Sequence, residues 1–119
     1  MDIRDLVKSF VDSDENPVVM CDLDYRIVYM NAVAEKRYGS INGKNLELFM
    51  TEEALTKLNM TIEWFREDKK NSRVFAFHDE PENVDVYIVA LRGTKGDLCG
   101  FSSVRRSRIP EDGKNYDLK

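Results

Sequence analysis

Apolar residues near the start of the chain recur with the spacing of one helical face. They lie at positions i, i+3, i+4, i+7 and i+8, as Ile3, Leu6, Val7, Phe10 and Val11. This spacing predicts an amphipathic helix over residues 1–12. The polar run that ends in Pro17 terminates it, because proline disfavours helical backbone at the residue before it. The helix therefore flanks the main domain.

Further along, short apolar runs separated by turn residues predict strands on both sides of a helical middle. The predicted strands are 18–21, 27–30, 74–79, 84–92 and 98–105. The predicted helical segments are 32–38, 45–50 and 52–68. Asn31 and Thr51 can cap the first and last of these helices, and Gly39 can close the first. This order predicts an α+β fold in which helices separate two halves of an antiparallel sheet.

Alternation along the last three predicted strands separates two faces of the sheet. One face carries Val74, Ala76, Val84, Val86, Ile88, Ala90, Phe101, Ser103 and Arg105. The other carries Phe75, Phe77, Tyr87, Val89 and Leu91. If the first face meets the helices, its small residues leave room for a ligand whose carboxylate Arg105 would bind. The alternative is a filled apolar core with Arg105 at its solvent edge.

Composition narrows the class of protein. The 119 residues are 42% hydrophobic and 34% charged, which indicates one folded domain. With 18 basic and 22 acidic residues the net charge is −4, so nucleic acid is not an expected partner. A basic cluster lies at 92–108, where solvated charge and an acidic partner are both open interpretations. No run is long enough to span a membrane, no signal peptide is recognisable, and two cysteines fit a reduced, cytoplasmic protein.

Several motifs, taken in order, resemble the PAS domain, a sensory and protein-interaction module. They are Pro17–Asp22, Asp24, Ile27–Ala32, Tyr38-Gly39, Gly43–Leu46 and Gly96–Phe101. The resemblance covers residues 15–106 and leaves 107–119 as a polar tail. It implies a curved five-stranded antiparallel sheet with short helices on one face and a pocket between them. Tyr25 replaces a turn glycine found in many relatives, which we expect to alter the hairpin only locally.

The resemblance also allows cofactor chemistry to be tested. Flavin-binding relatives carry a reactive cysteine in the segment that corresponds to 31–49, and this chain has no cysteine there. Those relatives also carry amide side chains that bond the flavin, at positions where this chain has Val74, Val84 and Arg105. Haem-binding relatives place a histidine on the long helix, whereas His78 is the only histidine. A metal site lacks ligands, because Cys21, Cys99 and His78 are too few. We therefore expect no flavin, haem or metal.

No nucleophile, base and orienting group converge in the sequence, so no catalytic residue is assigned. The prediction is a non-enzymatic sensory or regulatory module that acts in trans, because a single domain of this length leaves no room for an effector. The ligand-pocket candidates are Val74, Ala76, Val86, Ile88, Ala90, Phe101, Ser103, Arg105 and Tyr38. Two alternatives remain: a pure dimerisation module with a filled core, and a small enzyme that uses the same cleft.

The predicted partners are a second copy of the chain and a separate signalling protein. We expect the helix at 1–12 to cover the second sheet face, which is too apolar to be left bare, and to contribute to a homodimer. The residues assigned to this contact are Ile3, Leu6, Val7, Phe10, Val11, Phe75, Phe77, Tyr87, Val89 and Leu91. No membrane partner is expected.

Overall fold

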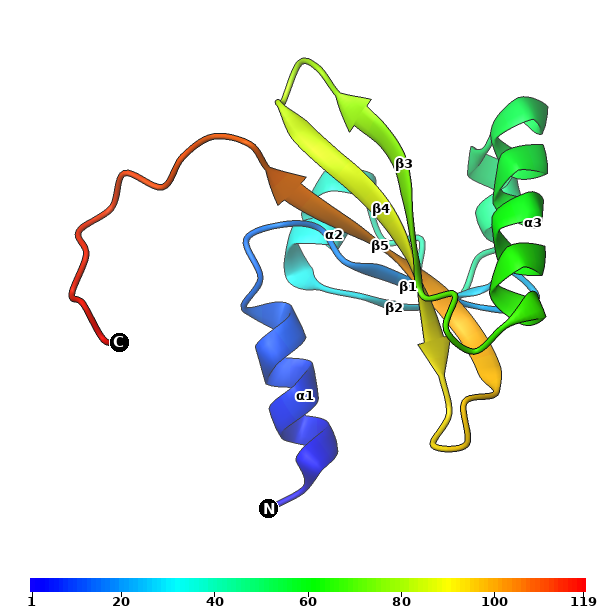
Figure 1. Cartoon of the computed structure of the whole chain (residues 1–119), viewed down its shortest axis with the longest axis horizontal. Helices are drawn as coiled ribbons and strands as arrows, with labels where there is room; N and C mark the ends of the chain where they lie inside the picture. The colour runs from blue at the N-terminus through cyan, green and yellow to red at the C-terminus, as the bar shows by residue number, and fades with distance from the viewer.

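The computed structural model describes residues 1–119 and contains a single five-stranded antiparallel sheet with helices around it (Figure 1). The strands are β1 (Val19–Asp22), β2 (Ile27–Met30), β3 (Arg73–Asp79), β4 (Val84–Arg92) and β5 (Leu98–Ser107). The helices are α1 (Ile3–Asp12), α2 (Ala32–Tyr38), the 3-10 helix η1 (Leu46–Phe49) and α3 (Glu52–Glu67). The spatial order β2-β1-β5-β4-β3 brings the two ends of the domain together at the β1–β5 pair. The predicted α+β fold is confirmed.

The core lies between one face of the sheet and α3. The side chains that α3 buries are Leu58, Ile62 and Phe65, which run along one face from the middle of the helix to its last turn. Phe65 is fully buried. Thr51 caps the start of α3 by accepting a hydrogen bond from the Ala54 N–H, as its residue type predicted. α3 is therefore anchored to the sheet mainly toward its C-terminal end.

Asn31 organises the junction between β2 and α2. Its side-chain oxygen accepts hydrogen bonds from the N–H groups of Val18 and Ala34, at 2.9 and 3.0 Å. Its amide nitrogen donates to the carbonyls of Val11 and Asn16. The side chain is fully buried, so all of its hydrogen-bonding capacity is used inside the protein. Asn31 is thus more than the helix cap that the sequence predicted.

Tyr25 adopts a positive φ of 65° in the β1–β2 turn. Its ring is buried and packs edge-on against Phe101, with 5.4 Å between the ring centroids. The hydroxyl donates to the Asn59 side chain on α3. The expectation of a purely local effect was wrong, because this turn supplies a core side chain.

A β-bulge in β3 changes which face Phe77 occupies. Phe75 pairs with Tyr87, but Phe77 pairs with Val86, so one extra residue, Ala76, is inserted between them. Beyond a one-residue insertion, side chains change face. Phe77 therefore lies on the same face as Val86, and the prediction that it shares the outer face with Phe75 was wrong.

Helix α1 does not cover the outer face of the sheet. Figure 1 shows it extending away from the domain, and its apolar side chains are exposed: 68% for Ile3, 48% for Leu6, 55% for Val7 and 81% for Phe10. Its contacts with the domain come from its last turn, where the Tyr29 hydroxyl donates to Asp12 and Asn31 donates to the Val11 carbonyl. The expected covering of the sheet is therefore absent within one chain. No helix is both long enough and apolar enough to cross a membrane.

Candidate functional site

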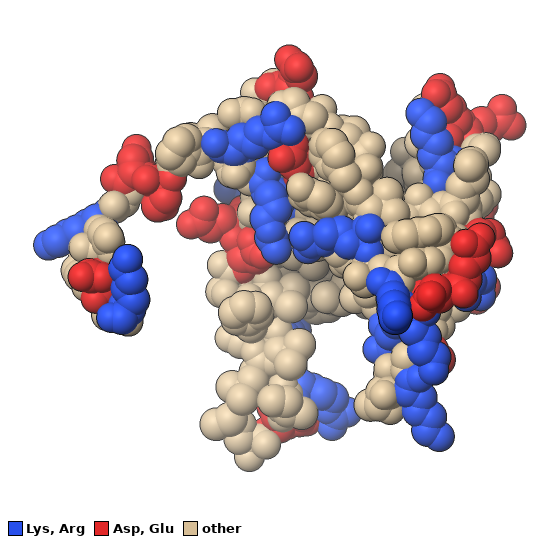
Figure 2. All heavy atoms as spheres, viewed as in Figure 1, with Lys and Arg blue, Asp and Glu red and all other residues tan.

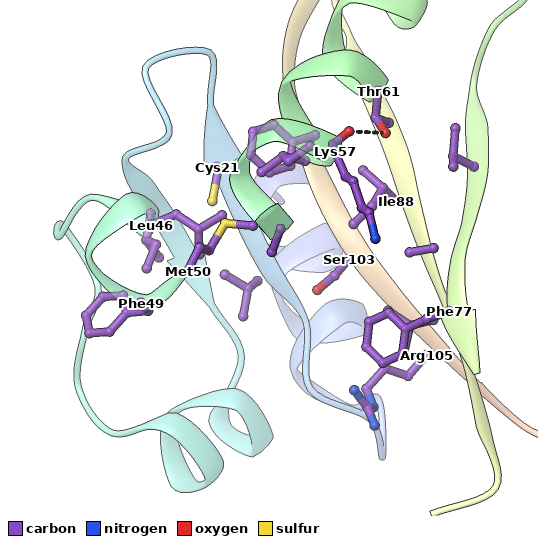
Figure 3. Close-up of a pocket in the computed structure, with 18 of the residues that line it drawn as sticks. Cys21, Leu46, Phe49, Met50, Lys57, Thr61, Phe77, Ile88, Ser103 and Arg105 are labelled. Carbon is purple, nitrogen blue, oxygen red and sulfur yellow. Dashed lines mark hydrogen bonds between the residues drawn. The ribbon is translucent and has the colours of Figure 1, made fainter. Parts of the chain in front are cut away.

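A cavity of about 660 Å³ opens between α3, η1 and the inner face of the sheet (Figure 3). Its wall is formed by 21 residues, of which 17 are hydrophobic. The non-hydrophobic lining residues are Lys57, Thr61, Ser103 and Arg105. This volume is in the range of sites that hold small organic molecules, roughly 300–1,000 Å³. The inner face is therefore not a filled core, and the alternative that assumed one is not supported.

The structure brings together nearly all of the predicted pocket residues. Those that line the cavity are Tyr38, Val74, Ala76, Val86, Ile88, Phe101, Ser103 and Arg105. Ala90 is the exception: it packs against the core and does not line the cavity. Phe75 and Phe77, which the sequence placed on the other face of the sheet, also line the cavity. That a ligand binds there stays a prediction.

Arg105 is already held by two carboxylates. Its Nη2 atom lies 2.7 Å from Asp79 Oδ2 and 3.0 Å from Glu82 Oε2, and Arg37 on α2 makes a second ion pair with Glu82 at 2.8 Å. The Arg105 guanidinium holds the pKa of Asp79 below its ordinary value, and Arg37 does so for Glu82. The network ties α2, the β3–β4 turn and β5 together at one end of the cavity. Arg105 therefore has a protein partner where the sequence suggested a ligand carboxylate.

Sequence reasoning missed the helical wall of the cavity. Lys57 and Thr61 lie on the face of α3 that includes Ala54 and Leu58, and all four line the cavity. Their spacing of three or four residues was visible in the sequence, but a lysine in a charged helix gives no signal that it faces a cavity. Figure 3 shows the Lys57 side chain pointing from α3 into this space. η1 and the residue after it contribute another part of the wall through Leu46, Phe49 and Met50.

The titratable groups of the lining do not form a catalytic set. It contains no histidine and no carboxylate. Burial raises the pKa of the Cys21 thiol to about 11, so this cysteine is protonated and a poor nucleophile at neutral pH. His78 lies on the outer face, where Nδ1 is 2.9 Å from Asp85 Oδ1. The cavity wall therefore brings no acid–base pair together.

The basic cluster at 92–108 is largely occupied by protein acceptors. Arg92 donates to four backbone carbonyls, Arg105 binds Asp79 and Glu82, and Arg108 lies 2.7 Å from Asp85 Oδ1. Figure 2 shows basic and acidic side chains interspersed over the visible face. These three arginines therefore bind groups of the protein itself, and an acidic partner for the cluster stays a prediction.

Solved structures identify the fold. A C-terminal domain from Streptococcus mutans is 23% identical, with a TM-score of 0.67 over 87% of this chain and 84% of that one. The PAS domain of a Colwellia psychrerythraea protein is 15% identical, with a TM-score of 0.64 over 89% and 97%. A sensory box sensor histidine kinase from Vibrio cholerae is 21% identical, with a TM-score of 0.58 over 87% of each. The sequence matches no protein-family model and no curated protein. The chain has the fold of a PAS domain, as its motifs predicted.

Proposed function

We propose that this PAS-fold chain is a sensory or regulatory module that binds a small organic ligand in the cavity between α3 and the sheet. The observation that carries the proposal is the cavity itself, about 660 Å³ in volume and mostly apolar. Relatives in fold whose names describe sensory proteins support the same class of function. A regulatory role requires a partner, for which the exposed apolar stripe of α1 is the best surface.

The lining argues for binding without catalysis and without flavin or haem. An enzyme in this cleft would need an acid and a base, and the wall offers no histidine, aspartate or glutamate. The amides that would bond a flavin edge and an imidazole for haem iron are also missing from the wall. The donor set fits an apolar molecule with few polar groups.

Native mass spectrometry of freshly purified protein, with an absorption spectrum, tests the binding proposal. We expect a co-purifying small mass, or a mass acquired from a metabolite mixture, and no visible chromophore. Ala54→Phe, which fills the cavity from α3, should abolish the added mass. Thr56→Phe is the matched control, because Thr56 is exposed on the same helix and its replacement should leave binding intact. A ligand that binds both variants equally would overturn the proposal, and so would a protein that acquires no mass.

A homodimer through α1 is the second part of the proposal. Four large apolar side chains on one face of this ten-residue helix are exposed in the single chain, and a second copy would remove them from water. The outer sheet face offers half-buried Tyr87, Val89 and Leu91 as a complementary apolar surface.

Light scattering coupled to size exclusion measures the subunit count. We expect the full chain to be dimeric and the chain without residues 1–12 to be monomeric. Phe10→Asp should dissociate the dimer, whereas Ser9→Asp places the same charge at an exposed polar position of α1 and should not. A monomeric full chain at high concentration would refute the dimer and leave the ligand proposal standing.

A further inference from the structure

The charged groups of the cavity wall are of one sign. Lys57 and Arg105 line it and no acidic residue does, although the whole chain carries a net charge of −4. An apolar wall with only cationic charges favours a molecule that carries negative charge. The lining therefore indicates the charge of the ligand as well as its size.

Two of the four polar lining groups are committed to the protein. Arg105 Nη2 donates to both Asp79 and Glu82, so a further anion there would meet two carboxylates of the same sign. The Thr61 hydroxyl donates to the Lys57 carbonyl at 3.0 Å, the bond drawn in Figure 3. These two groups shape the wall, and we do not expect them to carry the ligand's charge.

Of the four non-hydrophobic lining residues, Lys57 and Ser103 are left for a ligand. The Ser103 hydroxyl is on the inner face of β5 and makes no hydrogen bond to the protein, since the bond involving Ser103 uses its backbone carbonyl. Lys57 Nζ lies 3.1 Å from Glu53 Oε1, in a pair whose side chains are 73% and 82% exposed. An exposed pair of this kind is weak and exchanges readily for another anion. One ammonium and one hydroxyl together can donate hydrogen bonds to one carboxylate.

We propose that the cavity selects an amphipathic monocarboxylate, with its apolar body between α3 and the sheet and its carboxylate bound by Lys57 and Ser103. This rests on the proposed function, because it names the ligand class for the same cavity. The apolar body gains from the 17 hydrophobic residues of the wall. A single negative charge matches the single exchangeable cation, whereas a second carboxylate would have no partner.

Three probes with the same ten-carbon tail separate the contributions of tail and headgroup. Decanoate, decan-1-ol and decyltrimethylammonium are titrated into the full chain below their micelle-forming concentrations. Methyl shifts of Ala54, Val74 and Ile88, which line the cavity, report binding there and exclude adsorption on α1. We expect decanoate to bind roughly tenfold more tightly than decan-1-ol, as for one charge-assisted hydrogen bond, and the cation to bind most weakly.

Substitutions at the proposed headgroup site should shift affinity in opposite directions. Lys57→Met should weaken decanoate binding roughly 5- to 10-fold and leave decan-1-ol unchanged. Glu53→Gln should strengthen decanoate binding about two- to threefold, because it removes the competing carboxylate. Lys70→Met, which removes an exposed charge beyond the end of α3, is the matched control and should change neither ligand.

The outcomes distinguish this inference from the proposed function. If all three probes shift the cavity methyls with equal affinity, the cavity binds ligands but the carboxylate selection is wrong. The carboxylate selection is also wrong if Lys57→Met and Lys70→Met change decanoate affinity equally. If no probe shifts these methyls, both the inference and the ligand-binding proposal lose their support.

Discussion

Arg92 joins the end of α3 to the β4–β5 hairpin, and its replacement by methionine tests how α3 is anchored. Nη2 donates to the carbonyls of Phe65, Asp68 and Asn71 at 2.8, 3.2 and 2.8 Å, and Nη1 donates to Gly96 at 3.0 Å. The last carbonyls of a helix have no partner within it, so Arg92 supplies much of the C-terminal cap of α3, beside the Asn71 side chain, which donates to the Trp64 carbonyl. Methionine keeps most of the apolar stem and removes all of these donors.

The size of the effect follows from the setting of each bond. Three of the four hydrogen bonds are partly buried, and each is worth about 1 kcal/mol net, while water can replace the exposed bond to Asp68. Arg92 Nε is buried without a partner, so its removal returns about 1 kcal/mol. We therefore expect Arg92→Met to lower the free energy of unfolding by about 2 kcal/mol.

Urea unfolding, followed by circular dichroism and by the fluorescence of Trp64 on α3, measures this change. Arg106→Met is the control, because Arg106 is exposed on β5, and we expect it to change stability by less than about 0.5 kcal/mol. In both variants the free energy of unfolding should fall with urea concentration at the wild-type slope if the unfolded state is unaffected. An Arg92→Met variant as stable as Arg106→Met would refute the role of Arg92 as the anchor of α3.

Other groups give shorter tests. Asn31→Ala should destabilise the protein by about 3 kcal/mol in urea unfolding, because it leaves four backbone groups without their partner, one of them buried and three partly buried; a loss under about 1 kcal/mol would contradict the assigned bonds. A small thiol-methylating reagent at neutral pH should modify exposed Cys99 and spare Cys21, which is buried and has a pKa of about 11; mass spectrometry showing equal rates would count against that burial. The double substitution Asp79→Asn and Glu82→Gln should lower stability at pH 7. Because the folded-state pKa values of both carboxyls are lowered, their contribution is complete above the ordinary values of 3.8 and 4.5 and is lost as pH falls through the folded-state values. The thermal midpoints of variant and wild type should therefore converge in acid, and a difference that persists there would assign the effect to packing.

Local signals in the sequence predicted the elements well. Thr51 and Asn31 mark the starts of α3 and α2 because their side chains bond free helical N–H groups, and Gly39 ends α2 with φ of 84°. Strand alternation placed Ile88 and Ser103 on the cavity face correctly. These features depend on a few neighbouring residues, which is why they can be read without the fold.

Features that depend on pairing between distant segments could not be predicted from the sequence. Strict alternation places Phe77 on the same face of the sheet as Phe75. Only the pairing of β3 with β4 reveals the inserted Ala76. Arg105 looked free because its partners come from the end of β3 and the β3–β4 turn, whose approach to β5 is a property of the folded sheet. Lys57 resembled any solvated lysine until α3 was placed over the cavity.

The cavity and α1 are connected in the structure by a short series of hydrogen-bonded elements. Cavity residues Ser103 and Val19 are paired across β5 and β1, and β1 pairs with β2. At the end of β2, Asn31 bonds the carbonyl of Val11 in α1, and Tyr29 bonds Asp12. Because α1 contacts the domain mainly through its last turn, the β1–β2 hairpin and the segment 13–18 are the two routes that join the cavity to α1. Tyr29→Phe removes one of these connections without filling the cavity, so it should leave decanoate affinity unchanged while reducing any effect of decanoate on the subunit count. A variant that loses ligand affinity in parallel would show that Tyr29 supports the cavity and does not act as a connection.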